Sequence, residues 1–262
     1  FAGSGSIQWP PTRSPPDQAA PASGVGRAMG IASSCSGGIV SAFRCLTGGA
    51  SEAVGRLVLL RHDLTSSWLG SRSYWDAAYA AGRYSEEYEW LQSCETIWPH
   101  LQGTLPQHSR SSCRLLHVGC GNSRLGRVLH DAGFLDVTNV DYSARVVAMM
   151  RCREPALHWR CLDCSVPGAL GEPAAYDACV DKGALDSLFE AGTQRARERG
   201  CRMVAEVHRA LRPGGRYVLF SNAAAGLDAL REEFAEVSCE ALEGYSCDLY
   251  YRMLYLIVCM KQ

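Results

Sequence analysis

From residue 113 onward, short apolar runs alternate with segments of helical pattern, and this rhythm restricts the chain to few architectures. It is typical of parallel strands joined by helices that cover both faces of one sheet. We therefore expect a doubly wound α/β fold with a mostly parallel, Rossmann-like sheet of seven strands. Residues 249–260 follow the turn-like Glu243–Tyr245 and are expected to be the second arm of an antiparallel hairpin that closes the sheet. The other expected strands are residues 113–118, 137–140, 157–161, 176–180 and 216–220.

Capping and breaking residues mark the helices between these strands. Ser143 is the expected N-cap of a helix that runs to residue 150. A longer helix over residues 195–211 ends at Arg212-Pro213-Gly214-Gly215, because proline cannot continue a helix and glycine permits a left-handed turn. A further helix is expected over residues 123–132.

A glycine-rich loop, Gly119-Cys120-Gly121-Asn122, follows the first expected strand. Glycines let the backbone approach a ligand closely, and the helix that follows offers unpaired N–H groups to a carboxylate or a phosphate. In an open α/β sheet, ligands bind beyond the carboxyl ends of the strands, where the strand order reverses. A dinucleotide fingerprint would place its third glycine two positions before Gly126. The spacing favours S-adenosyl-L-methionine, whose carboxylate needs a less close approach than a pyrophosphate.

Two acidic residues stand at expected strand ends near this loop. Asp141 ends the second strand, where its carboxylate could accept hydrogen bonds from both hydroxyls of a ribose. Its alternative role is to cap the helix that starts at Ser143. Asp163 follows the third strand and could accept from an adenine amino group, or cap the turn before Pro167. The two alternatives stay open for each residue.

Five motifs span most of residues 74–215: Tyr74–Tyr79, Tyr88–Trp90, Val118–Ser123, Val140–Ser143 and Asp181–Asp186. In these motifs the chain resembles the class I, seven-strand methyltransferases that use S-adenosyl-L-methionine to methylate lysines of eukaryotic translation elongation factor 1-alpha. The Tyr-Trp-Asp opening combined with Asp-Lys-Gly-x-Leu-Asp is the most specific part. The resemblance implies a protein-lysine methyltransferase with elongation factor 1-alpha as its protein partner. The cofactor contacts that it implies are Trp75, Tyr79, Trp90, Gly119, Asp141, Tyr142, Asp163, Cys164 and Lys182, and Gly121 of the loop is added to them.

Some of these residues have a second interpretation. The aromatic residues before the first strand could close over the pocket and face a sulfonium cation, or form a hydrophobic clasp that holds the leading helix to the core. They are Trp75, Tyr79, Tyr88 and Trp90. Lys182 could reach a carboxylate of the cofactor, or form an ion pair with Asp186 four residues later.

Asp181 is the predicted catalytic residue. Methyl transfer is an in-line displacement, so the enzyme mainly aligns the nucleophile and excludes water. A lysine, with an unperturbed pKa of about 10.4, must lose a proton before it attacks. Asp181 follows the expected fourth strand, where it could orient the amine or receive that proton; alternatively, it binds the turn at residues 182–185. Family members often carry Glu and Thr where this chain has Asp181 and Ala184, and the shorter Asp reaches less far.

Other functions and partners are weighed against this one. The alternatives are transfer to a small molecule or another protein, and cofactor binding by a non-catalytic adaptor. The nearly balanced charge, with 26 basic and 27 acidic residues, gives no reason to expect a nucleic-acid partner. No apolar run has the length of a membrane helix. The 13 cysteines lack framework spacing and Cys161-x-x-Cys164 lacks a second ligand pair, so we expect reduced thiols, a cytoplasmic location and no metal site.

Residues 1–70 differ from the rest in composition. Prolines crowd the start, Gly, Ser and Ala follow, and hydrophobic periodicity is weak. We expect a disordered or low-complexity leader over residues 1–70, dispensable for folding and cofactor binding, and a methyltransferase domain over residues 71–262. Up to residue 62 the leader holds five arginines and only two acidic residues. This composition would also suit a transit peptide, which would place the protein in an organelle.

Replacement of Asp141 by alanine tests the predicted cofactor. Loss of a doubly hydrogen-bonded carboxylate should cost about 1.5–3 kcal/mol, or a roughly tenfold to hundredfold weaker affinity for S-adenosyl-L-methionine and its demethylated product. Isothermal titration calorimetry on the folded variant measures the change. An unchanged affinity would refute the prediction, and tight NAD binding would favour a dehydrogenase instead.

Overall fold

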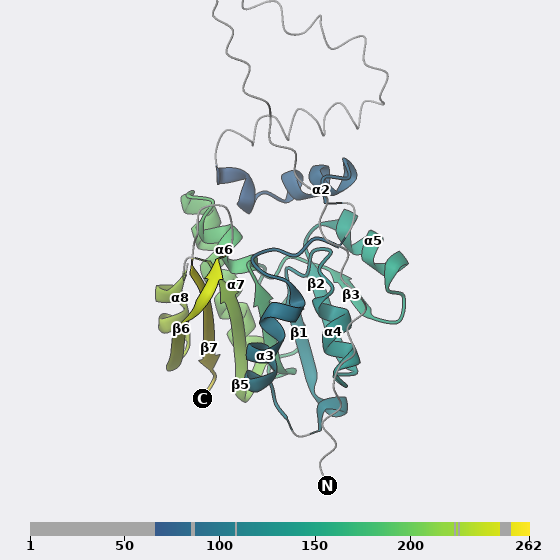
Figure 1. The fold of residues 1–262 in the computed structure, drawn as a ribbon. Coiled ribbons are helices and arrows are strands. Elements are labelled where there is room, and N and C mark those ends of the chain that lie inside the picture. The colour runs from purple at the N-terminus through teal and green to yellow at the C-terminus, as the bar shows by residue number, and fades with distance from the viewer. Residues whose placement is uncertain (1–65, 85–86, 108, 223, 225, 247–252) are drawn as a thin grey trace, which may run out of the picture. The chain divides into compact units, whose positions relative to one another are not determined.

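The computed structural model describes residues 66–84, 87–107, 109–222, 224, 226–246 and 253–262 (Figure 1). All of them belong to one unit of the chain, Ser51–Gln262. Residues 1–65, which make up most of the predicted leader, lie outside the described residues. The disorder predicted for them therefore stays a prediction.

Seven strands form one sheet: β1 (Arg114–Val118), β2 (Asp136–Asp141), β3 (His158–Cys161), β4 (Tyr176–Lys182), β5 (Leu211–Ser221), β6 (Glu236–Ser246) and β7 (Met253–Met260). Their order is β3-β2-β1-β4-β5-β7-β6. Neighbours among β1 to β5 are parallel, whereas β7 runs antiparallel to β5 and to β6. This arrangement confirms the predicted mostly parallel sheet with a C-terminal antiparallel hairpin.

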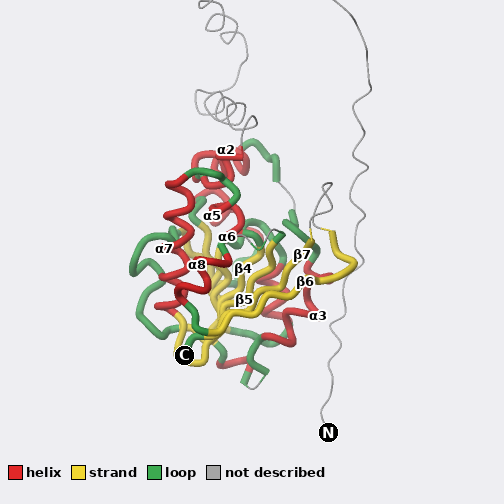
Figure 2. The backbone as a smooth tube through the Cα atoms, turned by 90° about the vertical axis from the view of Figure 1, so that its left-hand side faces the viewer, coloured by secondary structure: helices red, strands yellow, loops and turns green. Residues whose placement is uncertain are grey.

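Helices cover both faces of the sheet. They are η2 (Ser66–Gly70), α2 (Arg72–Ala80), α3 (Cys94–Thr104), η3 (Arg110–Ser112), α4 (Leu125–Asp131), α5 (Ala144–Arg153), α6 (Ala184–Phe189), α7 (Gln194–Ala210) and α8 (Leu227–Glu233). Figure 2 shows α3 on one side of the sheet and α7 and α8 on the other. The longest, α7, is capped by the hydroxyl of Thr193 and buries Met203, Val204 and Val207 at helical spacing.

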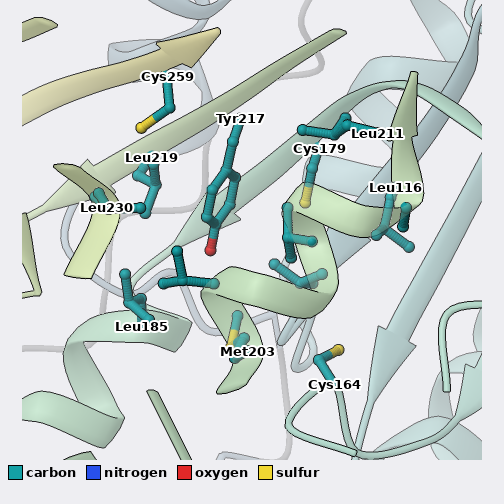
Figure 3. Packing of buried hydrophobic residues seen from close by; sticks show 14 of the residues in the cluster. Leu116, Cys164, Cys179, Leu185, Met203, Leu211, Tyr217, Leu219, Leu230 and Cys259 are labelled. Carbon is teal, nitrogen blue, oxygen red and sulfur yellow. The ribbon is translucent and has the colours of Figure 1, made fainter. Parts of the chain in front are cut away.

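The main hydrophobic core lies between the sheet and helices α6 to α8 (Figure 3). Leu116 of β1, Cys179 of β4 and Leu219 of β5 pack in one cluster with Met203 of α7 and Leu230 of α8. Burial of a large apolar side chain contributes about 1.5–3 kcal/mol to folding. This packing holds β1, β4 and β5 together, and so determines where their carboxyl ends lie.

The observed elements depart from the sequence prediction at two places, in β4 and in β5. β4 extends to Lys182 instead of ending at residue 180, so Asp181 lies within the strand. Residues 212–215, predicted as a turn before a strand, form an irregularity inside β5, where the register with β4 shifts. Gly214 has a φ of +76° there, a conformation that favours glycine. β7 begins at Met253, and the start predicted for it lies outside the described residues.

The folded unit includes residues that composition placed in the leader. The ring of Trp68, in η2, lies 4.3 Å from the ring of Tyr74 and 5.9 Å from that of Trp75, between centroids. The indole N–H of Trp75 donates to the carbonyl oxygen of Leu69 at 2.9 Å. These contacts join η2 to α2, so residues 66–70 belong with the domain rather than with a leader.

A chain that begins at residue 72 should be less stable than one that begins at residue 66. The shorter chain loses the ring contacts of Trp68 and the carbonyl that accepts from Trp75, each worth on the order of 1 kcal/mol. A loss of about 2 kcal/mol lowers the melting temperature of a domain of this size by roughly 4–8 °C. Thermal unfolding followed by circular dichroism measures the difference. Equal melting temperatures would support the boundary at residue 70 that composition predicted.

Candidate active site

One cavity lies at the carboxyl ends of β1, β2 and β4, beside α6. The structure brings to its wall all ten residues that were predicted to contact the cofactor, whereas the predicted catalytic residue Asp181 does not line it. Contact with a bound cofactor stays a prediction for each of the ten. They are Trp75, Tyr79, Trp90, Gly119, Gly121, Asp141, Tyr142, Asp163, Cys164 and Lys182.

The loop after β1 requires glycine at two positions. Gly119 and Gly121 have φ values of +56° and +51°, which other residues rarely adopt. A Cβ atom on Gly119 would lie 2.2 Å from the Cβ of Ala184, and one on Gly121 would lie 3.0 Å from the hydroxyl of Tyr79. The loop is therefore held between α6 and α2, and its bare backbone forms part of the cavity wall.

Asp141 supports this loop and also faces the cavity. Its carboxylate accepts from the backbone N–H of Gly121 at 3.0 Å and of Ser143 at 2.8 Å. Ser143 itself caps α5, as predicted, since its hydroxyl accepts from the N–H of Val146. Burial raises the pKa of Asp141 to about 6. Each carboxylate oxygen can accept a second hydrogen bond, so the residue fits a ligand with two hydroxyl donors, such as a ribose.

Asp163 is already paired with protein groups. One carboxylate oxygen accepts from the amide and hydroxyl of Ser165 at 2.9 and 2.6 Å, and the other accepts from Arg199 at 2.9 Å. Although burial raises its pKa, these hydrogen bonds and the charge of Arg199 hold the pKa below its usual value. Arg199 also lies 5.3 Å from the ring centroid of Tyr142. Asp163 therefore caps its turn, and an adenine amino group would share an oxygen with Ser165 or Arg199.

The aromatic residues before the sheet form both a clasp and a wall. The ring centroid of Trp75 lies 5.5 Å from the ring centroid of Trp90 and 6.2 Å from that of Tyr79. Trp75 packs in a buried cluster that includes Val146 and Met150 of α5. The same rings line the cavity. The two interpretations that sequence left open are thus compatible, because the rings hold α2 to the core and also shape the pocket.

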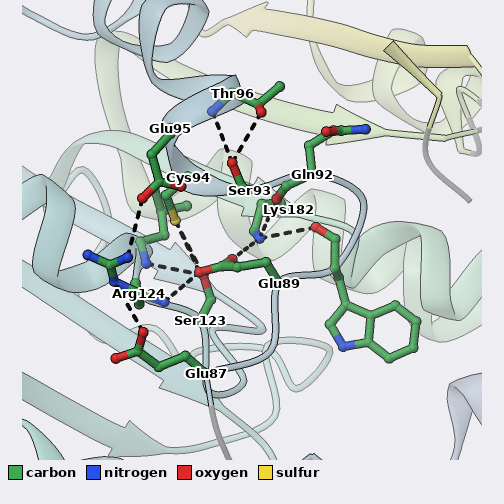
Figure 4. Close-up of polar contacts among 12 residues, drawn as sticks. Glu87, Glu89, Gln92, Ser93, Cys94, Glu95, Thr96, Ser123, Arg124 and Lys182 are labelled. Carbon is green, nitrogen blue, oxygen red and sulfur yellow. Dashed lines mark hydrogen bonds and ion pairs between the residues drawn. The ribbon is translucent and has the colours of Figure 1, made fainter. Parts of the chain in front are cut away.

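Lys182 has a partner that sequence reasoning missed. Its ammonium group forms a buried ion pair with Glu89 and donates to the carbonyl oxygens of Trp90 at 3.1 Å and Gln92 at 3.2 Å (Figure 4). The predicted ion pair with Asp186 is not formed. Although Lys182 lines the cavity, its charge is neutralised by the protein itself and needs no cofactor carboxylate.

Glu89 connects this contact to the glycine-rich loop. Its carboxylate also accepts from the hydroxyl of Ser123 at 2.7 Å and the backbone N–H of Arg124 at 2.8 Å. Burial raises the pKa of Glu89, but Lys182 and these hydrogen bonds outweigh burial and leave the pKa below its usual value. The signal in the sequence was an acidic residue between two aromatic ones, because burial of the rings also buries a charge that needs a partner.

The structure does not place the predicted catalytic residue Asp181 on the cavity wall. Its carboxylate is buried and accepts from the backbone N–H of Ala184 at 2.7 Å and of Leu185 at 3.1 Å, and from the hydroxyl of Tyr217 at 2.8 Å. Burial raises its pKa to about 6. Successive side chains of a strand point to opposite faces, so Lys182 reaches the cavity while Asp181 points away from it. The geometry favours the alternative role, in which Asp181 holds the first turn of α6.

A different carboxylate of the same motif lines the cavity. Asp186, in the first turn of α6, is 5% exposed and accepts from the hydroxyl of Ser221 at 2.6 Å and the N–H of Asn222 at 2.9 Å. Burial raises its pKa to about 7. Asn222, which follows β5, also lines the cavity. Sequence reasoning had considered Asp186 only as a partner of Lys182.

Two further properties concern the described residues alone. Among them, no group of three or more His, Cys, Asp and Glu side chains could hold a metal ion. In the same part of the chain, no helix has the length and apolar character needed to cross a membrane. The thiols of Cys161 and Cys164 are free.

Known proteins similar to this chain include methyltransferases. Residues 116–219 match the family described as "Methyltransferase domain". Over 161 residues the chain is 37% identical to EEF1A lysine methyltransferase 4 of Bos taurus. The matched residues make up 58% of this chain and 60% of that protein. Over 166 residues it is 31% identical to the eEF1A lysine and N-terminal methyltransferase of Homo sapiens, and the matched residues make up 62% of this chain and 23% of that protein. The chain thus spans less than two thirds of the length of either relative.

Two solved structures share the fold at low sequence identity. The [4+2]-cyclase SpnF has a TM-score of 0.51 at 16% identity and covers 80% of this chain and 96% of its own. The 1,6-didemethyltoxoflavin-N1-methyltransferase of Burkholderia thailandensis has a TM-score of 0.51 at 18% identity. The match covers 73% of this chain and 87% of that structure. One of the two is named a cyclase, so the fold alone does not determine the reaction. The match over residues 116–219 is to a methyltransferase domain, in agreement with the sequence motifs.

Removing one partner of the buried ion pair should be costly. Lys182→Met leaves the partly buried carboxylate of Glu89, 18% exposed, without its cation and should lower the free energy of unfolding by at most about 3–5 kcal/mol. The double variant Lys182→Met, Glu89→Gln removes both charges and should recover much of that loss. Urea unfolding at pH 7 measures the three proteins. A single variant as stable as the unmodified chain would contradict the importance of the pair.

The same ion pair should make stability depend on pH. The pKa of Glu89 lies below its ordinary value of 4.5 in the folded chain. The stability that the ionised carboxylate contributes is therefore present above pH 4.5 and is lost as the pH falls through the folded pKa. The difference in unfolding free energy between the unmodified chain and the double variant should shrink as the pH is lowered from 7 to about 3. A difference that is constant over this range would contradict the shift.

Proposed function

We propose that this protein transfers a methyl group from S-adenosyl-L-methionine to the ε-amine of a lysine, and that elongation factor 1-alpha is its acceptor. The observation that carries the proposal is one cavity with two different halves. The glycine-rich loop and Asp141 suit the cofactor, and the opposite side presents the carboxylate of Asp186. The two relatives at 37% and 31% identity are named for methylation of eEF1A lysines, which supports the same acceptor here.

The residues around the cofactor half have binding and shielding roles. When bound, S-adenosyl-L-methionine supplies a methyl group that its sulfonium activates. Asp141 holds the ribose hydroxyls, and the backbone at Gly119 and Gly121 leaves room for the ligand. The rings of Trp75 and Trp90 exclude water from the wall, and their faces favour a neighbouring cation. Such a site works mainly by alignment, which is what methyl transfer requires.

The acceptor half favours a cationic nucleophile. Asp186 and Glu190 both line it, and carboxylates there attract an ammonium group and repel a carboxylate or a phenolate. A lysine must also lose one proton before it attacks, and Asp186 has a pKa near 7, suited to a group that exchanges protons at neutral pH. The chemistry of this wall therefore supports an amine acceptor over an acidic one.

Incubation of elongation factor 1-alpha with this protein and labelled S-adenosyl-L-methionine tests the proposal. The intact mass of the factor should rise by one or more methyl groups, and peptide fragmentation should place them on lysine. The Asp141→Ala variant, at cofactor concentrations below saturation, should transfer roughly tenfold to hundredfold more slowly. Methylation at another residue type would refute the substrate class.

The same reaction run in a cell extract separates the alternatives. Label in small molecules, with none on protein, would favour a small-molecule methyltransferase. Label on a different protein would keep the reaction and replace the acceptor. Cofactor binding without transfer to any component would favour an adaptor.

A further inference from the structure

Hydrogen-bond acceptors with unused capacity lie on the cavity wall where α6 meets the end of β5. The carboxylate of Asp186 accepts one hydrogen bond on each oxygen, from Ser221 and from the backbone of Asn222, and each oxygen can accept another. The side-chain oxygen of Asn222 is buried and has no hydrogen-bond partner among the described residues. Both side chains belong to the cavity lining. A buried acceptor without a donor is unfavourable, so this patch is suited to a ligand that supplies donors.

We propose that Asp186 and Asn222 form the subsite that binds the acceptor amine beside the transferred methyl group. This inference rests on the proposed function and assigns residues to its acceptor half. A primary ammonium group offers three N–H donors and no acceptor, which matches the acceptor oxygens of Asp186 and Asn222. A hydroxyl offers one donor, and a carboxylate offers none. The two residues therefore select the class of nucleophile, in addition to holding it.

The position of this subsite relative to the glycine-rich loop supports the assignment. Ala184 lies close to Gly119, because a Cβ atom added to the glycine would be 2.2 Å from the Cβ atom of Ala184. Asp186 follows two residues later in the same helix, on the β4 and β5 side of the loop, whereas Asp141 lies on the β2 side. A ligand held at Asp141 that crosses the bare backbone of Gly119 thus arrives at Asp186. Asp141 and Asp186 would therefore contact opposite ends of the bound ligands.

The subsite also accounts for the proton that the amine must lose. Asp186 takes that proton, and Asn222 accepts one of the remaining N–H groups, so that the nitrogen lone pair is free to face the methyl carbon. The lone pair then forms the N–C bond while the S–C bond breaks and leaves its electron pair on sulfur. The groups that surround Asp186 support this role. Burial, Asp181 and Glu190 raise the pKa of its carboxyl to about 7, while Ser221 and Asn222 lower it.

Two cofactor analogues that differ at the methyl position test the subsite without any acceptor protein. S-adenosyl-L-homocysteine has no group there, and sinefungin has a primary amine. Calorimetry on the full chain gives the ratio of their dissociation constants. Asp186→Asn should reduce the preference for sinefungin roughly tenfold or more, because a charge-assisted hydrogen bond is lost, and Asn222→Ala should reduce it by a smaller factor. Asp131→Asn is the control, since it removes one carboxylate charge from α4, outside the cavity lining, and it should leave the ratio unchanged.

The outcomes separate the subsite from the proposed function. An unchanged ratio in Asp186→Asn overturns the subsite if that variant binds S-adenosyl-L-homocysteine and melts as the unmodified chain does. If Asp186→Asn does not fold, an unchanged ratio in Asn222→Ala overturns it. A ratio that falls equally in Asp131→Asn also overturns it, because general electrostatics would then explain the effect. Failure to methylate any lysine would refute the proposed function alone, since the ratio is measured without an acceptor.

Discussion

The buried ion pair between Glu89 and Lys182 joins the parts of the chain that build the cavity. Lys182 ends β4, Glu89 belongs to the aromatic segment 87–92, and the same carboxylate accepts from Ser123 and Arg124 beside the glycine-rich loop. Two buried charges are tolerated only when they are paired and hydrogen-bonded. Any other placement of the aromatic segment would leave one of them buried alone. The sheet provides the floor of the cavity, and this contact determines where its aromatic wall stands.

Three buried aspartates near strand ends show how surroundings separate the roles of one residue type. Burial raises the pKa of Asp141 and Asp181 to about 6 and that of Asp186 to about 7. Asp181 is enclosed by α6 and the hydroxyl of Tyr217, so its carboxylate serves structure. Asp141 and Asp186 each give part of their hydrogen-bonding capacity to the backbone and keep the rest for the cavity. A shifted pKa therefore does not identify a functional residue until its partners and its access to the cavity are known.

The sequence predicted features that depend on neighbouring residues and missed those that depend on distant ones. The sheet, the glycine-rich loop, Asp141 at a strand end and the cap at Ser143 follow from local patterns of apolar residues, glycine and hydroxyls. The ion pair of Glu89 and Lys182 joins residues 93 positions apart, and no local pattern reports such a contact. The burial of Asp181 could not be predicted because β4 continues through it, and the alternation of side chains along a strand decides which face each one reaches.

The division of the cavity explains why a methyltransferase fold does not by itself determine the acceptor. The cofactor half is built from the ends of β1 and β2, whose loop and carboxylate motifs can be read from the sequence. The proposed acceptor half comes from Asp186 of α6 and Asn222 after β5, so it uses different residues from the cofactor half. A cyclase and a methyltransferase with similar folds, at 16% and 18% identity, are consistent with such independence. In the proposed acceptor wall of this chain, each carboxylate oxygen of Asp186 can accept one further hydrogen bond and the side-chain oxygen of Asn222 has no partner among the described residues, which is the environment that a donor-rich amine satisfies.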